Sequence, residues 1–148
     1  MGRGVGQRRR ARRGRDLCGT QFSLATTMTR KRHVIMVVDD DHDLRESLRE
    51  ILEEEGFDTL GASNGKEAIE LLLAGGQPRP RAILLDIMMP VMTGLDVVDR
   101  LRGDRAMGKT PVVLMTAFRT LVKTNERTRV LFKPFSIDGV LSAIRNAC

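Results

Sequence analysis

The sequence predicts one α/β domain in which helices cover both faces of a doubly wound, five-stranded parallel sheet. Uninterrupted apolar runs at 34–38, 82–85 and 112–115 are typical of strands that are buried on both faces. Amphipathic helical patterns lie between these runs. Because strand and helix patterns alternate five times over about 115 residues, right-handed parallel crossovers are the expected connections.

The first half of this pattern is expected to hold two strands and two helices. The run 34–38 is the first strand, and the segment 57–60 only alternates apolar and polar residues, which predicts a half-buried edge strand. A helix with its apolar stripe three or four residues apart is expected after each strand. The two stripes are Leu44, Leu48, Ile51 and Leu52, then Ile69, Leu72 and Leu73. Gly56 and the pair Gly75 and Gly76 follow the stripes, as left-handed residues that end helices do.

The second half is expected to hold the third, fourth and fifth strands at 82–85, 112–115 and 130–132. Two more helical stripes accompany them, formed by Leu95, Val98 and Leu101, then by Ile137, Val140, Leu141 and Ile144. The longest apolar runs belong to the first, third and fourth strands, which should therefore be central. The expected strand order is 2-1-3-4-5, with its reversal between the first and third strands.

The connection before the fifth strand is unusual. Only the residues 117–132 separate Thr116 from Lys133, and the last of these must form the strand itself. About twelve residues remain, which is close to the minimum for a parallel crossover that contains a helix. The stretch 119–128 lacks an apolar stripe and is rich in β-branched residues. A shortened or irregular fourth helix is therefore predicted.

Three carboxylates stand where two of the central strands end. Asp39 and Asp40 follow the first strand and Asp86 follows the third, so all three should meet at the edge of the sheet where ligands bind. An Asp after a strand is more commonly a helix N-cap or a solvated loop residue, and that interpretation is adopted for Asp41 and Asp43. Carboxylates packed together repel one another unless a cation lies among them, and hard oxygen ligands favour Mg²⁺.

Complementary groups end the other two strands. Thr116 supplies a hydroxyl after the fourth strand, and Lys133 supplies an ammonium group after the fifth. Lys133 could instead be a surface lysine with a buried stem, although its position between a strand and Pro134 disfavours this. Met88 and Met89 are expected to pack or to lie in a loop, because thioethers prefer soft metals.

These residues together resemble the receiver domain of two-component response regulators, over residues 33–147. Four ordered motifs carry the resemblance: Val37-Val38-Asp39-Asp40-Asp41, Asp86 with Pro90 and Gly94, Met115-Thr116-Ala117, and Lys133-Pro134-Phe135. A pair of adjacent aspartates alone would be weak support, whereas four motifs that each close a strand in this order are specific. The resemblance implies the flavodoxin-like strand order 2-1-3-4-5.

Carried over to this chain, the resemblance implies that Asp86 accepts a phosphoryl group from the phosphohistidine of a sensor histidine kinase or phosphotransfer protein. It implies that Asp40, Asp86 and the backbone carbonyl of Met88 hold Mg²⁺ directly, with Asp39 acting largely through water. Such chemistry requires a divalent cation, because the cation screens the repulsion between the carboxylate and the phosphate.

The resemblance also implies how the phosphoryl group is bound and how its presence is signalled to other proteins. Thr116 and Lys133 would bind the phosphoryl oxygens, and the bond from Lys133 to Pro134 would be cis. A protein of this kind catalyses only its own aspartyl phosphorylation and dephosphorylation. It is expected to signal through altered contacts with a downstream protein.

The chain departs from the family pattern in two places. The crossover before the fifth strand is short, and Val130 stands three residues before Lys133, where receivers commonly carry an aromatic residue. Both departures concern the coupling of the phosphate to the outer face. Either an altered output or a different partner at that face is expected, while the acidic pocket is retained. Met88 and Phe118 flank the phosphoryl site in this family, and their bulk is expected to slow the entry of water.

Residues 1–32 differ from the rest of the chain. They hold ten Lys and Arg against one acid, whereas residues 33–148 hold fifteen basic and eighteen acidic residues. This composition predicts a disordered basic extension before a domain at 33–148. It could bind nucleic acid or an anionic membrane, or serve as a transit peptide. A start of translation at Met28 is favoured, because no aromatic residues interleave the arginines at positions 3–15.

The remaining expectations concern location and alternatives. Cys18 and Cys148 lie near the ends of the chain, and no apolar stretch is long enough to span a membrane, which together favour a reducing cytoplasm. The chain ends just after its fifth helix, so a stand-alone receiver is expected. A pseudo-receiver or nucleic-acid-binding adaptor is the alternative. A haloacid-dehalogenase-type phosphatase is disfavoured, because Asp43 stands where Thr or Val is needed.

Overall fold

Five parallel strands form one sheet in the computed structural model, which describes residues 31–119 and 122–148. The strands are β1 (Val34–Val38), β2 (Asp58–Ala62), β3 (Ala82–Asp86), β4 (Val112–Thr116) and β5 (Thr128–Phe132). Their order is β2-β1-β3-β4-β5, as predicted from the apolar runs. The expectations for the basic extension, Cys18 and the Met28 start lie outside the described residues.

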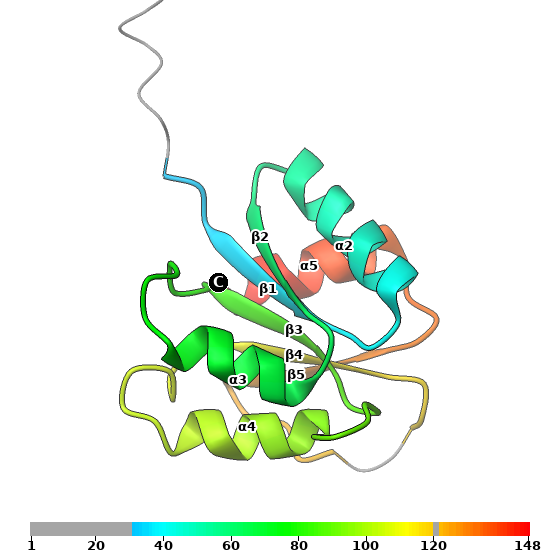
Figure 1. Ribbon diagram of the computed structural model, residues 1–148. Helices are drawn as coiled ribbons and strands as arrows, with labels where there is room; N and C mark the ends of the chain where they lie inside the picture. The colour runs from blue at the N-terminus through cyan, green and yellow to red at the C-terminus, as the bar shows by residue number, and fades with distance from the viewer. Residues whose placement is uncertain (1–30, 120–121) are drawn as a thin grey trace, which may run out of the picture. The chain divides into compact units, whose positions relative to one another are not determined.

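Among the residues that the structure describes, four helices cover the sheet: α2 (His42–Glu54), α3 (Gly65–Leu73), α4 (Gly94–Arg102) and α5 (Ile137–Ala147). Figure 1 shows α2 and α5 on one face of the sheet and α3 and α4 on the other. The core is divided in the same way, because one buried cluster packs against α2 and α5 and the other against α3 and α4. No helix in the described ranges is long and apolar enough to cross a membrane.

Burial of the strands follows the sequence pattern. All residues of β1, β3 and β4 are buried, as expected for central strands of a parallel sheet. The edge strand β2 begins at an exposed residue and has a single buried one, Ala62. Strand β5 is the second edge, and only Thr128 of its five residues is buried.

Local sequence signals fix where the helices begin and end. Each helix has an N-cap whose side-chain oxygen accepts a hydrogen bond from a backbone N–H of the first turn: Asp41, Asn64, Thr93 and Ser136. Asp41 is therefore a capping residue, as predicted. Gly56, Gly75 and Gly76 have φ angles of 92°, 72° and 82°, in the left-handed region predicted for helix ends.

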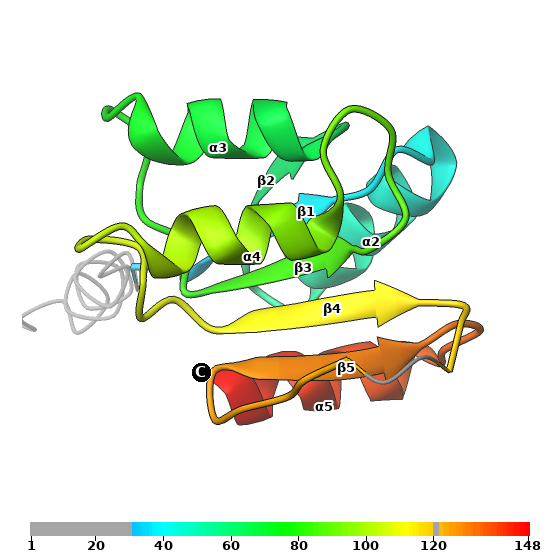
Figure 2. The ribbon, with the colours of Figure 1, turned by 90° about the horizontal axis from the view of Figure 1, so that it is seen from below.

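The connection from β4 to β5 contains no helix within residues 117–119 and 122–127. Asn125 and Thr128 instead form an isolated antiparallel bridge with two backbone hydrogen bonds of 3.2 Å. The connection is irregular, as predicted from its lack of an apolar stripe. In Figure 2 it runs back beside β4 and β5, whereas α3 and α4 cover the neighbouring strands.

Candidate functional site

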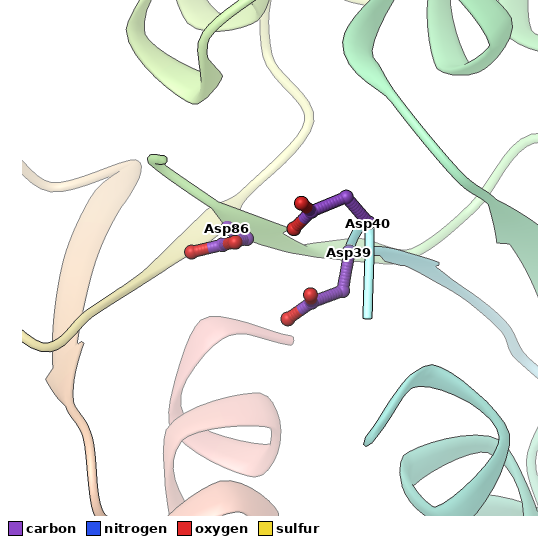
Figure 3. A group of neighbouring side chains, drawn as sticks. All are labelled: Asp39, Asp40 and Asp86. Atoms are coloured by element: carbon purple, nitrogen blue, oxygen red, sulfur yellow. The ribbon is translucent and has the colours of Figure 1, made fainter. Parts of the chain in front are cut away.

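The three carboxylates at the ends of β1 and β3 lie together. One oxygen from each of Asp39, Asp40 and Asp86 lies within 4.8 Å of the other two. Asp39 and Asp86 are buried, with 1% and 5% of their surface exposed, whereas Asp40 is exposed. Figure 3 shows the carboxyl groups of Asp39 and Asp40 extending toward the side on which Asp86 lies. The group is therefore a buried acidic pair with a third acid at its open side.

Lys133 joins this cluster from the end of β5. Its Nζ lies 3.2 Å from Asp39 Oδ2 and 3.4 Å from Asp86 Oδ1. The chain direction here is set by the backbone N–H of Lys133, which donates a 2.7 Å hydrogen bond to the carbonyl of Thr116. The Lys133–Pro134 peptide bond is cis, as the resemblance implied. One ammonium group thus bridges two carboxylates that are far apart in the sequence.

The buried charges shift one another's protonation. Burial, followed by repulsion from Asp39, raises the pKa of Asp86, and the attraction of Lys133 offsets only part of this. Burial disfavours the charged form of Lys133, but the carboxylates of Asp39 and Asp86 outweigh it and raise the lysine pKa. The lysine therefore remains an ammonium group, while the negative charge of the cluster is incompletely compensated.

Asp39 is fixed by two further contacts. Its Oδ1 accepts a 2.9 Å hydrogen bond from the backbone N–H of Asp41. Its backbone carbonyl accepts a 2.7 Å hydrogen bond from Nη1 of Arg45, whose side chain is only 13% exposed. Arg45 was not predicted, because a lone arginine in an amphipathic helix looks like an ordinary surface residue. The turn between β1 and α2 is therefore fixed through both the side chain and the backbone carbonyl of Asp39.

Thr116 lies at the same edge of the sheet, one residue beyond Met115, which pairs with Asp86 in the register of β3 and β4. The residue is buried, with 2% of its surface exposed. Its Oγ1 accepts a 3.1 Å hydrogen bond from the backbone N–H of Phe118. The hydroxyl is thus tied to the start of the β4–β5 connection.

The loop after β3 brings backbone groups close to Asp86. Met88 makes a backbone hydrogen bond that favours the ionised form of Asp86 and so lowers its pKa slightly against the larger raising effects. A Cβ on Gly94 would overlap the carbonyl oxygen of Asp86, so this glycine is required for close packing as well as for the predicted turn. Val91 has a φ angle of 72°, which is a strained conformation for a β-branched residue. No sequence signal predicted that strain.

The acidic cluster suits a divalent cation such as Mg²⁺. Oxygens on opposite sides of a bound Mg²⁺ are about 4.2 Å apart, so an oxygen spread of 4.8 Å needs little closure. The incompletely compensated charge on Asp86 also favours a cation at this place. The donor set consists of hard carboxylate oxygens, with Asp40 on the accessible side.

The fold and this site define a receiver-type signalling domain, and comparison with known proteins agrees. The family described as the response regulator receiver domain matches residues 35–145, so the chain belongs to that family and to two-component signalling. Relatives include response regulator MprA of Mycolicibacterium vanbaalenii, 36% identical over 121 residues, and DNA-binding response regulator MtrA of Mycobacterium tuberculosis H37Rv, 43% identical over 123 residues. The matches cover 75% and 80% of this chain.

The matches extend over only part of each curated relative. They cover 48% of MprA and 51% of MtrA, so the chain spans about half the length of these curated relatives. Among solved structures, chemotaxis protein CheY4 of Vibrio cholerae has a TM-score of 0.65 at 26% identity, with 79% of this chain and 99% of that chain covered. The receiver domain of Francisella response regulator 1452 has a TM-score of 0.63 at 28% identity, with 77% and 94% covered.

Proposed function

We propose that Asp86 accepts a phosphoryl group from a phosphohistidine on a partner protein, in a reaction that requires Mg²⁺. The observation that supports this most directly is that Asp86 lies 3.4 Å from Lys133 Nζ and close to the carboxylates of Asp39 and Asp40. Asp86 thus contacts one cation and belongs to an acidic cluster that could hold a second. A carboxylate surrounded in this way can approach an anionic phosphoryl group.

In the transfer step, an oxygen of Asp86 attacks phosphorus while the bond from phosphorus to the partner's imidazole nitrogen breaks. The imidazole leaves with the bonding electrons and takes up a proton. Asp39, Asp40, Asp86 and the Met88 carbonyl would hold the Mg²⁺, which screens the charge of the incoming group. The ammonium group of Lys133, which pairs with Asp39 and Asp86 in this structure, can instead bind a phosphoryl oxygen within the same pocket. Thr116 is the second candidate donor to the phosphoryl oxygens.

The aspartyl phosphate is expected to be temporary, because the same pocket can bring water to the phosphorus. Met88 and Phe118 have exposed side chains, with 60% and 57% of their surface accessible. They follow Asp86 and Thr116 by two residues each, and we propose that they limit the access of water. In this proposal Phe118→Ala hydrolyses its phosphate faster than the wild type, and an unchanged rate would contradict the role.

The proposed partners are a sensor histidine kinase or phosphotransfer protein and a downstream protein target. The name of MtrA describes DNA binding by that protein, whose length is about twice the matched region. We propose that the receiver described here acts through protein contacts. A cytoplasmic location is part of the proposal, because Cys148 is the free and exposed cysteine of the described ranges.

The experiment that tests the phosphorylation is intact-mass measurement after incubation with a small acyl-phosphate donor. Wild type and Asp86→Asn are compared with Mg²⁺ and with EDTA, and circular dichroism verifies that both are folded. We expect the wild type to gain the mass of one phosphoryl group when Mg²⁺ is present. We expect no gain in EDTA and none in Asp86→Asn. No gain in a folded protein that binds Mg²⁺ would contradict the proposal and favour the pseudo-receiver or adaptor.

A further inference from the structure

The carboxylate of Asp40 is held differently from the other two acids of the cluster. Asp39 and Asp86 are buried, and each pairs with Lys133. Asp40 is exposed, and among the residues that the structure describes its carboxylate makes no hydrogen bond or ion pair. The place of Asp40 in the cluster therefore depends on the two peptide groups that flank it.

Both of these peptide groups are fixed by hydrogen bonds. On the C-terminal side of Asp40, the N–H of Asp41 donates a 2.9 Å hydrogen bond to Oδ1 of Asp39. On the N-terminal side, the carbonyl of Asp39 accepts a 2.7 Å hydrogen bond from Nη1 of Arg45. Because a peptide group is planar, a contact at this carbonyl also fixes the direction in which the backbone continues to Asp40. Arg45 thus helps to set where the Asp40 side chain leaves the backbone.

Arg45 is itself held in place on α2. Its side chain is 13% exposed, and its Nε lies 3.7 Å from Oε1 of Glu46. Hydrogen bonds from Ser63 lower the pKa of Glu67, burial opposes them in part, and the positive charge of Arg45 lowers this pKa further. The guanidinium therefore has two acidic neighbours, one on α2 and one on α3. A planar group confined in this way loses little freedom when it also binds a carbonyl.

We propose that Arg45 is a positioning residue for Mg²⁺, which holds the peptide group between Asp39 and Asp40 so that the Asp40 carboxylate points into the cluster. Mg²⁺ demands nearly ideal octahedral geometry, so a small rotation of one ligand lowers the affinity. Replacing a residue that orients a metal ligand typically costs about 10–100-fold in metal affinity. The inference rests on the proposed function, because it takes the acidic cluster to be the Mg²⁺ site.

The sign of the effect separates positioning from a simple effect of charge. Arg45→Met keeps an apolar stem on α2 but removes both the hydrogen bond to the Asp39 carbonyl and the positive charge. Loss of a positive charge near the cluster would by itself strengthen the binding of Mg²⁺. Loss of the hydrogen bond that orients Asp40 would weaken it. The direction of the change in affinity therefore decides between the two roles.

The first experiment is a calorimetric titration of the full chain with MgCl₂. Arg45→Met is expected to bind Mg²⁺ about tenfold more weakly than the wild type. The control is Arg49→Met, because Arg49 lies one turn further along α2 and donates hydrogen bonds to Thr59 and Glu46 instead. Its affinity for Mg²⁺ should equal that of the wild type. Unchanged or tighter binding by Arg45→Met, or an equal loss in Arg49→Met, would overturn the inference alone. Failure of the folded wild type to bind Mg²⁺ would overturn the proposed function as well.

A second experiment measures how the rate of phosphorylation by acyl phosphate depends on the concentration of Mg²⁺. Arg45→Met is expected to need about tenfold more Mg²⁺ for its half-maximal rate and to reach the wild-type rate at saturation. A lower maximum with an unchanged half-saturating concentration would contradict positioning of the metal. Circular dichroism in EDTA verifies that the variant is folded. Arg45→Gln, whose side chain is shorter, is the second variant and should show the same loss of Mg²⁺ affinity.

Discussion

At the scale of single residues, the site is governed by an excess of negative charge. Two buried carboxylates, Asp39 and Asp86, share one ammonium group, and Asp40 adds a third negative charge at the open side. Burial weakens the screening by water, so the excess is felt mostly by Asp86. Binding of a divalent cation, or protonation of Asp86, would relieve this repulsion.

We expect Asp86→Asn to raise the free energy of unfolding in EDTA at neutral pH, because the neutral amide avoids the burial of charge and the repulsion from Asp39 that disfavour the ionised Asp86 carboxylate. The folded protein raises the pKa of Asp86, so ionisation is less favourable there than in the unfolded chain. The penalty is present above the folded pKa and disappears below the unfolded value of 3.8.

Urea titrations of wild type and Asp86→Asn between about pH 3 and about pH 7 measure this difference. The two stabilities should converge at the acidic end of the series and separate as the pH rises. A variant that is less stable than the wild type at neutral pH would mean that the ion pair with Lys133 outweighs burial and repulsion.

At the scale of elements, helix α4 and the loop before it determine the position of the Asp86 backbone. The N–H of Gly94 donates a 2.9 Å hydrogen bond to the carbonyl of Ile87, and its Cα passes close to the backbone of Asp86. The capping box of Thr93 and Asp96 fixes the start of the helix directly beside it. The helix therefore begins against the backbone of Asp86.

Gly94→Ala is expected to lower stability by about 1–3 kcal/mol, because its Cβ would overlap Asp86 and lie 2.9 Å from Ile87 Cα. It should also slow phosphorylation by acyl phosphate, since Asp86 must move. The control is Gly103→Ala at the other end of α4, where the nearest atom would lie 3.6 Å away. Equal effects of both substitutions on stability and rate would contradict this role of Gly94.

A second element-scale feature is the attachment of the β4–β5 connection by Arg102. Arg102→Met removes four hydrogen bonds to oxygens, so we expect a loss of about 2 kcal/mol or more. Hydrogen exchange should speed up at the amide of Val112, which donates to the Arg127 carbonyl. Arg100→Met, an exposed arginine on the same helix, serves as the control. If hydrogen exchange at the Val112 amide is unaltered in Arg102→Met, the end of the connection does not depend on Arg102.

The sequence was sufficient for the features that depend on local pattern. Strand order followed from run length, and the irregular connection followed from the absent stripe between Thr116 and Lys133. Strand ends were enough to bring Asp39, Asp40 and Asp86 together. Other contacts join residues that are far apart in the sequence, and no sequence pattern predicted them. The contact from Arg102 to a chain segment 25 residues away is one example.

At the scale of the whole described molecule, the acidic cluster adjoins the β4–β5 connection. The connection leaves β4 at Thr116 and returns to β5 at Thr128. At its start, the Phe118 N–H donates a hydrogen bond to the Thr116 hydroxyl. A change at Thr116 can therefore alter the first residues of the connection.

Binding of Mg²⁺ should stabilise the whole fold, because the cation binds the assembled cluster and not the unfolded chain. At ten times the dissociation constant, the gain is about 1.4 kcal/mol. We expect differential scanning calorimetry to show a higher Tm with Mg²⁺ than with EDTA. The shift should be smaller in Asp40→Asn, whereas Asp138→Asn, on α5 and outside the cluster, should retain it. A shift of equal size in all three proteins would indicate nonspecific binding.

The sparse burial of β5 affects how long the contacts of Lys133 with the acidic cluster persist. This edge strand has one buried residue out of five, so its opening should need less free energy than that of the central strands. Lys133 directly follows β5, while the carboxylates it bridges are held by the well-packed β1 and β3. Brief detachment of one strand can thus withdraw the ammonium group from intact acids. The lifetime of the assembled pocket is then shorter than the lifetime of the fold.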